Sequence, residues 1–160
     1  MSGRIYGGGT VQGLSEALAE RVEEAVESLC LETDKKAFRA PQIIRGFAPA
    51  KRSHQEAEPP TIIVYPVDGR IENDGTYRVK AGISAVIYGE DFSDSDWLLV
   101  IIHRVIQSFQ ERPVLAKRYI LEYPLAWDIN FDQAYPFWQL EMITEWTIPA
   151  PVMLPDEGVI

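Results

Sequence analysis

Four carboxylates crowd into the stretch GEDFSDSDW, residues 89–97: Glu90, Asp91, Asp94 and Asp96. Side chains at this density could ligate a divalent cation, act as general acid and base, or start a helix. A calcium loop needs oxygen ligands at alternate positions, a glycine at its turn and a closing glutamate. Counted from Asp91, the next alternate positions hold Ser93 and Ser95, and an aromatic residue follows. The stretch therefore does not match a calcium loop.

The same stretch matches the start of an α-helix position by position. Ser93 at the N-cap has Asp96 three residues later, which is the spacing of a capping box. Phe92 and Trp97 stand where a hydrophobic staple would join the two sides of the cap. Acidic residues in a first turn also complement the partial positive charge of the helix N-terminus. The acids predict a helix start, and the search for function moves elsewhere.

Other reactive residue types occur singly. His54 and His103 are the only histidines, and neither has a serine, cysteine or acid at a motif spacing. The one cysteine, Cys30, falls on an apolar helical face, which favours a small buried side chain over a nucleophile. The glycines at 7–9 are followed by Thr-Val-Gln-Gly, which does not match a phosphate-binding loop. We therefore predict no catalytic residue, no metal ligand and no cofactor.

Length and composition limit the class of protein. A chain of 160 residues suits one domain that needs no disulfide or metal to fold. The net charge of −9 argues against a nucleic-acid surface as the main partner. No apolar run approaches the ~18 residues of a membrane span, and the first nine residues lack the apolar part of a signal peptide. The expected protein is soluble and made in the cytoplasm.

The charge is concentrated unevenly along the chain. The segment 34–60 holds three acids and six basic residues, namely Lys35, Lys36, Arg39, Arg45, Lys51 and Arg52. The remainder holds nine basic and 21 acidic residues. Prolines and the absence of a sustained period make this basic segment a long loop, and such loops are usually functional or disordered. We expect it to bind an acidic surface of another copy, such as the glutamate-rich face of the first helix.

Apolar periodicity predicts the order helix, strand, strand, helix, strand, strand. The helices are expected from about Ser15 to Glu32 and from Ser93 to Arg112. The strands are expected at 61–67, 77–87, 119–131 and 137–148. This order predicts an α+β domain in which a four-stranded antiparallel sheet has both helices packed on one face.

The expected domain spans residues 15–149, between a flexible glycine-rich arm at 1–14 and a proline-rich tail at 150–160. Pro124 lacks a backbone donor, which predicts an edge position or a β-bulge in the third strand. Trp127, Trp138 and Trp146 fall on the periodic faces of their strands, which predicts core packing.

Four segments of the chain, together with the capped helix between the second and the third of them, carry a resemblance to a known family. The segments are APQIIRGFAP, PPTIIVYPVDG, YILEYPLAWDI and PFWQLEMITEW. Together they resemble the tail-completion or tail-terminator (head–tail joining) proteins of long-tailed bacteriophages and prophages. The likeness covers roughly residues 15–149 and rests on framework positions: Pro41, Gly46, Pro49, Pro60, Pro66, Pro124, Trp127, Trp138 and Trp146.

The resemblance implies a small α+β structural protein, not an enzyme, that forms a ring, usually a hexamer, at the end of the tail tube. That ring would stop tail polymerisation and join tail to head. Its partners would be other copies, the tail tube protein and a head-completion or connector protein, with no membrane and no specific nucleic-acid binding, although DNA could pass through the ring. Its location would be the virion tail, and the host cytoplasm during assembly.

An alternative remains open from the residues themselves. The chain could be an α+β enzyme or a small-ligand-binding module whose site is assembled from scattered residues. A deep pocket lined by Glu122, Asp128 or His103 would favour that alternative.

Overall fold

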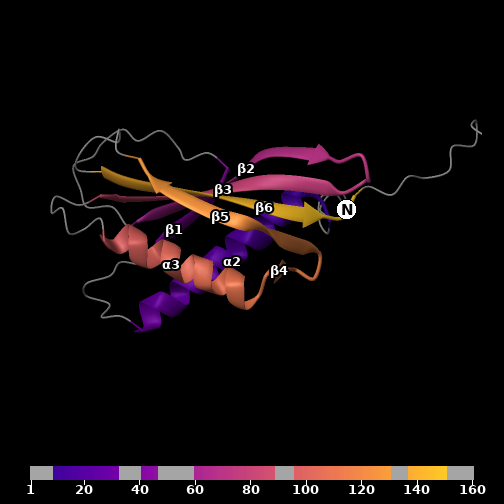
Figure 1. Ribbon diagram of the computed structural model, residues 1–160. Coiled ribbons are helices and arrows are strands. Elements are labelled where there is room, and N and C mark those ends of the chain that lie inside the picture. The colour runs from indigo at the N-terminus through magenta and orange to yellow at the C-terminus, as the bar shows by residue number, and fades with distance from the viewer. Residues whose placement is uncertain (1–8, 33–40, 47–59, 89–95, 131–136, 151–160) are drawn as a thin grey trace, which may run out of the picture.

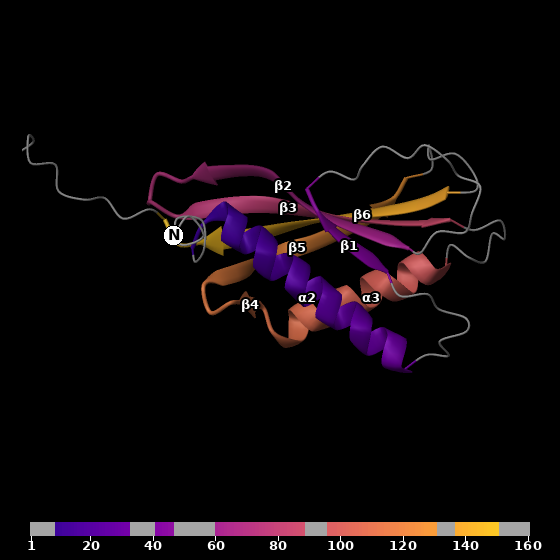
Figure 2. The ribbon, with the colours of Figure 1, turned by 180° about the vertical axis from the view of Figure 1, so that it is seen from behind.

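The computed structural model describes residues 9–32, 41–46, 60–88, 96–130 and 137–150. In these residues the elements are α2 (Val11–Glu32), β1 (Gln42–Arg45), β2 (Thr61–Ile71), β3 (Tyr77–Tyr88), α3 (Asp96–Glu111), β4 (Val114–Leu115), β5 (Tyr119–Ile129) and β6 (Phe137–Ile148). Figures 1 and 2, which view the molecule from opposite sides, show one layer of strands with both helices on the same face.

The strands form one curled, mixed sheet in the order β1-β2-β3-β6-β5-β4. β1 pairs with β2 in parallel, and every other neighbouring pair is antiparallel. The prediction of a four-stranded antiparallel sheet is therefore wrong, although the α+β class is correct. β1 has four residues and β4 has two, and strands this short produce no alternating pattern that a sequence could reveal.

The core lies between the helix pair and one face of the sheet. Every second side chain of the two central strands is buried there: Val79, Ala81, Ile83, Ala85 and Ile87 from β3, and Leu140, Met142, Thr144, Trp146 and Ile148 from β6. The Phe109 ring of α3 meets the Trp146 ring of β6 edge to face, with centroids 5.5 Å apart and planes at 86°. The alternation of long strands thus fixes which sheet face receives the helices.

α2 begins at Val11, earlier than the predicted start at about Ser15. The Gly13 amide donates to the Thr10 hydroxyl at 3.0 Å, so Thr10 is the N-cap. The buried Tyr119 hydroxyl accepts a hydrogen bond from the Gly9 amide at 2.8 Å and attaches this helix start to β5. The last residues of the predicted glycine-rich arm are therefore helical.

The second helix, α3, begins at Asp96. The predicted cap residue Ser93 lies outside the described residues, as do residues 1–8 of the arm and 151–160 of the tail.

The predictions for β5 and for the tryptophans have mixed outcomes. The register of β5 against β6 shifts between Glu122 and Ala126, and no described strand pairs with the outer edge of β5 there, so the prediction of an edge position or a β-bulge at Pro124 is confirmed. Trp146 is fully buried and Trp138 packs against the core, as predicted. Trp127 is 44% exposed, so the prediction of core packing is wrong for this residue. It lies on β5 beyond the part that β4 covers, where the sheet is open.

Candidate binding surface on the open sheet face

The sheet face opposite the helices is largely polar and is ordered by strand register. One cross-strand row holds Lys80, Glu145 and Glu122, from β3, β6 and β5 in turn. The next row holds Gly82, Ile143 and Ala126, and the row beyond it Ser84, Glu141 and Asp128. Directly opposed residues in a sheet share a face, so these side chains are neighbours on the open face.

The first of these rows contains a like-charge pair that is neutralised. Glu122 and Glu145 stand directly opposite each other, an arrangement that destabilises a sheet when uncompensated. The Arg78 guanidinium lies 3.6 Å from the Glu122 carboxylate and 4.0 Å from that of Glu145. Arg70 approaches Glu145 to 3.2 Å. Two cations therefore offset the two carboxylates.

The third row contains a second like-charge pair without such compensation. Asp128 and Glu141 are cross-strand partners. Glu141 accepts a hydrogen bond from the Tyr65 hydroxyl, which contributes no positive charge. Within the described chain, this row and the rows on either side of it contain no lysine or arginine. The pair leaves a local excess of negative charge on the open face.

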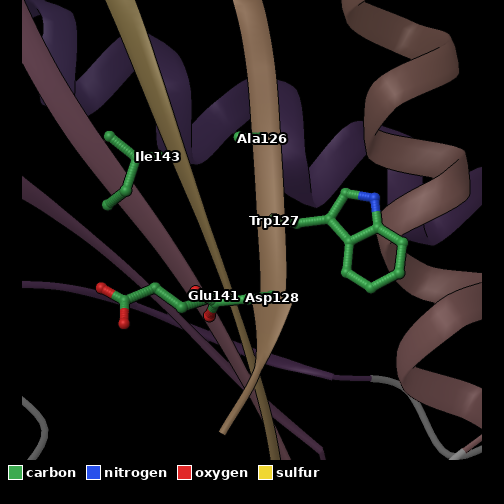
Figure 3. A pocket seen from close by; sticks show the side chains of 5 residues that line it. All are labelled: Ala126, Trp127, Asp128, Glu141 and Ile143. Carbon is green, nitrogen blue, oxygen red and sulfur yellow. The ribbon is translucent and has the colours of Figure 1, made fainter.

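A hollow of about 220 Å³ lies at this pair. Its lining residues are Ala126, Trp127, Asp128, Glu141 and Ile143. Figure 3 shows Glu141 and Ile143 on one side of the strands and the Trp127 indole directed to the other side. The small Ala126 beside Ile143 leaves an apolar floor next to the two carboxylates. Such a lining suits a group that is apolar along its length and cationic at its end.

Tyr65 holds one wall of the hollow in place. Its ring lies across Gly82, where an added Cβ would stand only 2.3 Å from the Tyr65 Cζ atom. Burial of the phenol, together with its hydrogen bond to Glu141 and the charge of that residue, raises the pKa of Tyr65. The phenol therefore stays protonated and donates to Glu141. Glycine at 82 is what lets the ring reach that carboxylate.

Replacing Gly82 with alanine is expected to push the Tyr65 ring away and weaken its bond to Glu141. The expected cost is about 1–3 kcal/mol of unfolding free energy, as for other overpacked sites. Urea denaturation followed by circular dichroism measures it. Tyr65→Phe is the matched comparison, because it removes only the hydroxyl and is expected to cost about 0.5–1.5 kcal/mol. A Gly82→Ala protein as stable as the wild type would show that the ring does not need this glycine.

The backbone edges of the sheet are open at both ends in the part of the chain that is described. β4 pairs with β5 only at Tyr119 and Ile120. From Glu122 to Ile129 no described strand covers the outer edge of β5, and Tyr123 there is 58% exposed. At the other end, β1 pairs only with β2 among the described strands. Open edges of this kind are templates for pairing with another chain.

Of the six basic residues predicted to form a subunit interface, Arg45 is the one that lies in the described chain. Its guanidinium is 3.8 Å from the Glu16 carboxylate of α2, and both side chains are well exposed. An exposed pair of this kind contributes only about 0–1 kcal/mol. The other five, Lys35, Lys36, Arg39, Lys51 and Arg52, lie outside the described residues. Their role in an interface stays a prediction.

The residues considered for an enzyme or ligand site are not brought together. His103 is exposed on α3, on the helix side of the sheet. Glu122 accepts a hydrogen bond from Thr147 at 3.0 Å and pairs with Arg78 on the open face. Asp128 alone of the three lines the hollow. Sequence reasoning did not identify Ala126, Glu141 or Ile143 as its other lining residues.

Two further observations concern only the described residues. His, Cys, Asp and Glu side chains there form no group of three that could hold a metal ion. None of the described helices has the length and apolar character needed to cross a membrane. His54 and the Cys30 side chain lie outside the described set.

No protein-family model and no curated protein matches the sequence. A solved structure whose title is only a sequence identifier shares 12% identity with this chain, at a TM-score of 0.46. The match covers 88% of this chain and 97% of the other. A likeness at this level carries no argument about function.

Proposed function

We propose that this chain is a structural subunit of bacteriophage or prophage tails. It assembles as a ring at the end of the tail tube, stops tube polymerisation and joins the tail to the head. The resemblance of its framework prolines and tryptophans to those of tail-terminator proteins supports the assignment to that family. The observation that carries the proposal is the open outer edge of β5 from Glu122 to Ile129.

This edge has the character of a contact surface. Tyr123 is 58% exposed and Trp127 44% exposed, beside backbone groups that no described strand pairs. Tyrosine and tryptophan are enriched at protein interfaces because they bury large areas at low entropic cost. An exposed aromatic edge in a free monomer would be a liability for aggregation unless a partner covers it. Another copy of the chain is the partner that the proposal assigns.

The two open edges favour a ring over a simple dimer. β1 and β5 are different surfaces at opposite ends of the sheet order. A contact between the β1 edge of one copy and the β5 edge of the next is head to tail. Head-to-tail contacts generate closed rings when the rotation between copies closes. A ring of this kind matches the assembly that the resemblance implies.

The proposal is tested with purified wild-type protein and polymerising tail tube protein. The wild type is expected to cap tube ends as rings in electron micrographs and to limit tube length. Trp127→Glu places a charge in the aromatic edge and is expected to weaken association by about 30-fold or more, as loss of a central interface aromatic does. Sedimentation velocity measures the association.

Leu99→Glu is the matched control for this variant. Leu99 is a comparably exposed apolar residue, but it belongs to α3 and not to β5. The control is expected to associate like the wild type. A wild-type protein that neither caps tubes nor self-associates, even with tubes present, would refute the proposed function.

A further inference from the structure

We infer that the hollow between β5 and β6 is a socket for a lysine or arginine side chain from residues 34–60 of a neighbouring copy. The socket consists of the lining residues whose side chains share the open face, namely Ala126, Asp128, Glu141 and Ile143. The inference rests on the proposed function, and it names the contact through which one subunit holds the next.

The shape and lining of the socket fit one long cationic side chain. Its volume of about 220 Å³ lies below the roughly 300–1,000 Å³ of pockets that take drug-sized ligands. Ala126 and Ile143 are cross-strand partners and provide an apolar floor for an aliphatic stem. Asp128 and Glu141, the next pair along the strands, receive the charged head.

Electrostatics explain why the Asp128–Glu141 pair, and not the Glu122–Glu145 pair, receives a cation from another copy. Glu122 and Glu145 already have Arg78 and Arg70 within 4.0 Å. The opposed carboxylates of the socket have no lysine or arginine in their own or the adjoining described rows. An incoming cation therefore forms ion pairs with two carboxylates that no lysine or arginine of these described rows offsets. Because Tyr65 already orients Glu141, less side-chain freedom is lost on binding.

The charge distribution of the chain identifies the source of the cation. The basic segment, residues 34–60, carries six basic and three acidic residues, whereas the remainder of the chain carries nine basic and 21 acidic residues. β1 is part of that segment and lies at the opposite end of the strand order from β5 and the short β4. A cation-rich segment and an acidic socket are complementary in charge, and because β1 and β5 lie toward opposite ends of the sheet order, a contact between copies that joins them is head to tail. This places the socket in a head-to-tail contact.

The other acidic surface fits a basic side chain less well. The exposed face of α2 carries several glutamates, but Glu24 lies 2.9 Å from Arg112 and Glu16 lies 3.8 Å from Arg45 of the same chain. Part of that face is therefore already neutralised.

The decisive variant is Asp128→Lys combined with Glu141→Gln, which reverses the socket charge yet leaves an amide oxygen for the Tyr65 hydroxyl. Its self-association, measured by sedimentation velocity at low salt, is expected to fall by about tenfold or more. Glu23→Lys combined with Glu27→Gln makes the same charge change on exposed positions of α2 and is the control. The control is expected to associate like the wild type.

A charge-swap rescue identifies the donor. Lys35→Glu with Lys36→Glu, or Lys51→Glu with Arg52→Glu, is introduced into the socket variant. One of the two combinations is expected to restore association, because the reversed segment now meets a reversed socket. Failure of both to restore it would overturn the assignment of the donor segment.

The outcomes separate this inference from the proposed function. Rings of normal stability in the socket variant, or an equal loss in the α2 control, would refute the socket while leaving the ring intact. A wild type that never associates would overturn both.

Discussion

Replacing Trp146 with alanine is expected to lower the free energy of unfolding by about 3–5 kcal/mol. Its side chain is fully buried and packs edge to face on Phe109. Its indole nitrogen donates to the Thr144 hydroxyl at 2.8 Å, and that hydroxyl donates to the Ala81 carbonyl at 2.8 Å. The substitution removes the largest buried side chain between α3 and the central strands. Because domains are stable by only ~5–15 kcal/mol, this loss would leave the fold marginal.

Urea denaturation followed by far-ultraviolet circular dichroism checks this result without relying on tryptophan fluorescence. Trp127→Ala is the matched control, since the same residue type is 44% exposed on β5. Its expected cost in a dilute, monomeric sample is about 1 kcal/mol or less. Equal losses at the two positions would mean that the Phe109–Trp146 contact is not the centre of the core.

Replacing Arg21 with methionine is expected to lower the free energy of unfolding by about 2–3 kcal/mol, because a buried, charged donor to backbone carbonyls is lost. Arg21 is only 8% exposed, and its guanidinium donates to the Arg112 carbonyl at 2.7 Å. The same group donates at 3.4 Å to the carbonyls of Ser108 and Val114. These acceptors belong to the end of α3 and the start of β4, where a helix leaves carbonyls without intrahelical partners. Burial, and then the charge of Arg112, lower the pKa of Arg21.

Denaturation in urea again gives the free energy, and amide hydrogen exchange reports whether the last turn of α3 opens first. Arg112→Met is the control, because the Arg112 side chain is exposed and pairs with Glu24 at 2.9 Å on the surface. Its backbone carbonyl remains available to Arg21, so a cost of at most about 1 kcal/mol is expected. If the two substitutions were equally harmless, Arg21 would not be the group that holds this helix end.

The sequence alone determined the elements whose patterns are long and local. β6 has the predicted bounds of 137–148, because most of its residues alternate between apolar and polar types, a pattern that needs no partner to be recognised. The end of α3 before Pro113 follows from a residue that cannot continue a helix. The irregular pairing of β5 around Pro124, at a sheet edge, follows from a missing backbone donor. Each of these follows from the chemistry of nearby residues.

Only the tertiary structure decided what depends on partners distant in the chain. β1 and β4 are strands because neighbours supply their hydrogen bonds, so their short sequences carry no period. The burial of Trp146 and exposure of Trp127 depend on what covers each strand, although both residues alternate correctly.

The residues of the socket, too, were only partly predictable from the sequence. The sequence revealed a basic segment on an acidic chain, and it even raised Asp128 as a candidate, but it could not pair that residue with Glu141. Strand register made that pairing, and a shift of one residue would have turned Asp128 to the helix face. Register is set by the whole sheet and its bulge, so the composition of the surface could be read from the sequence but its geometry could not.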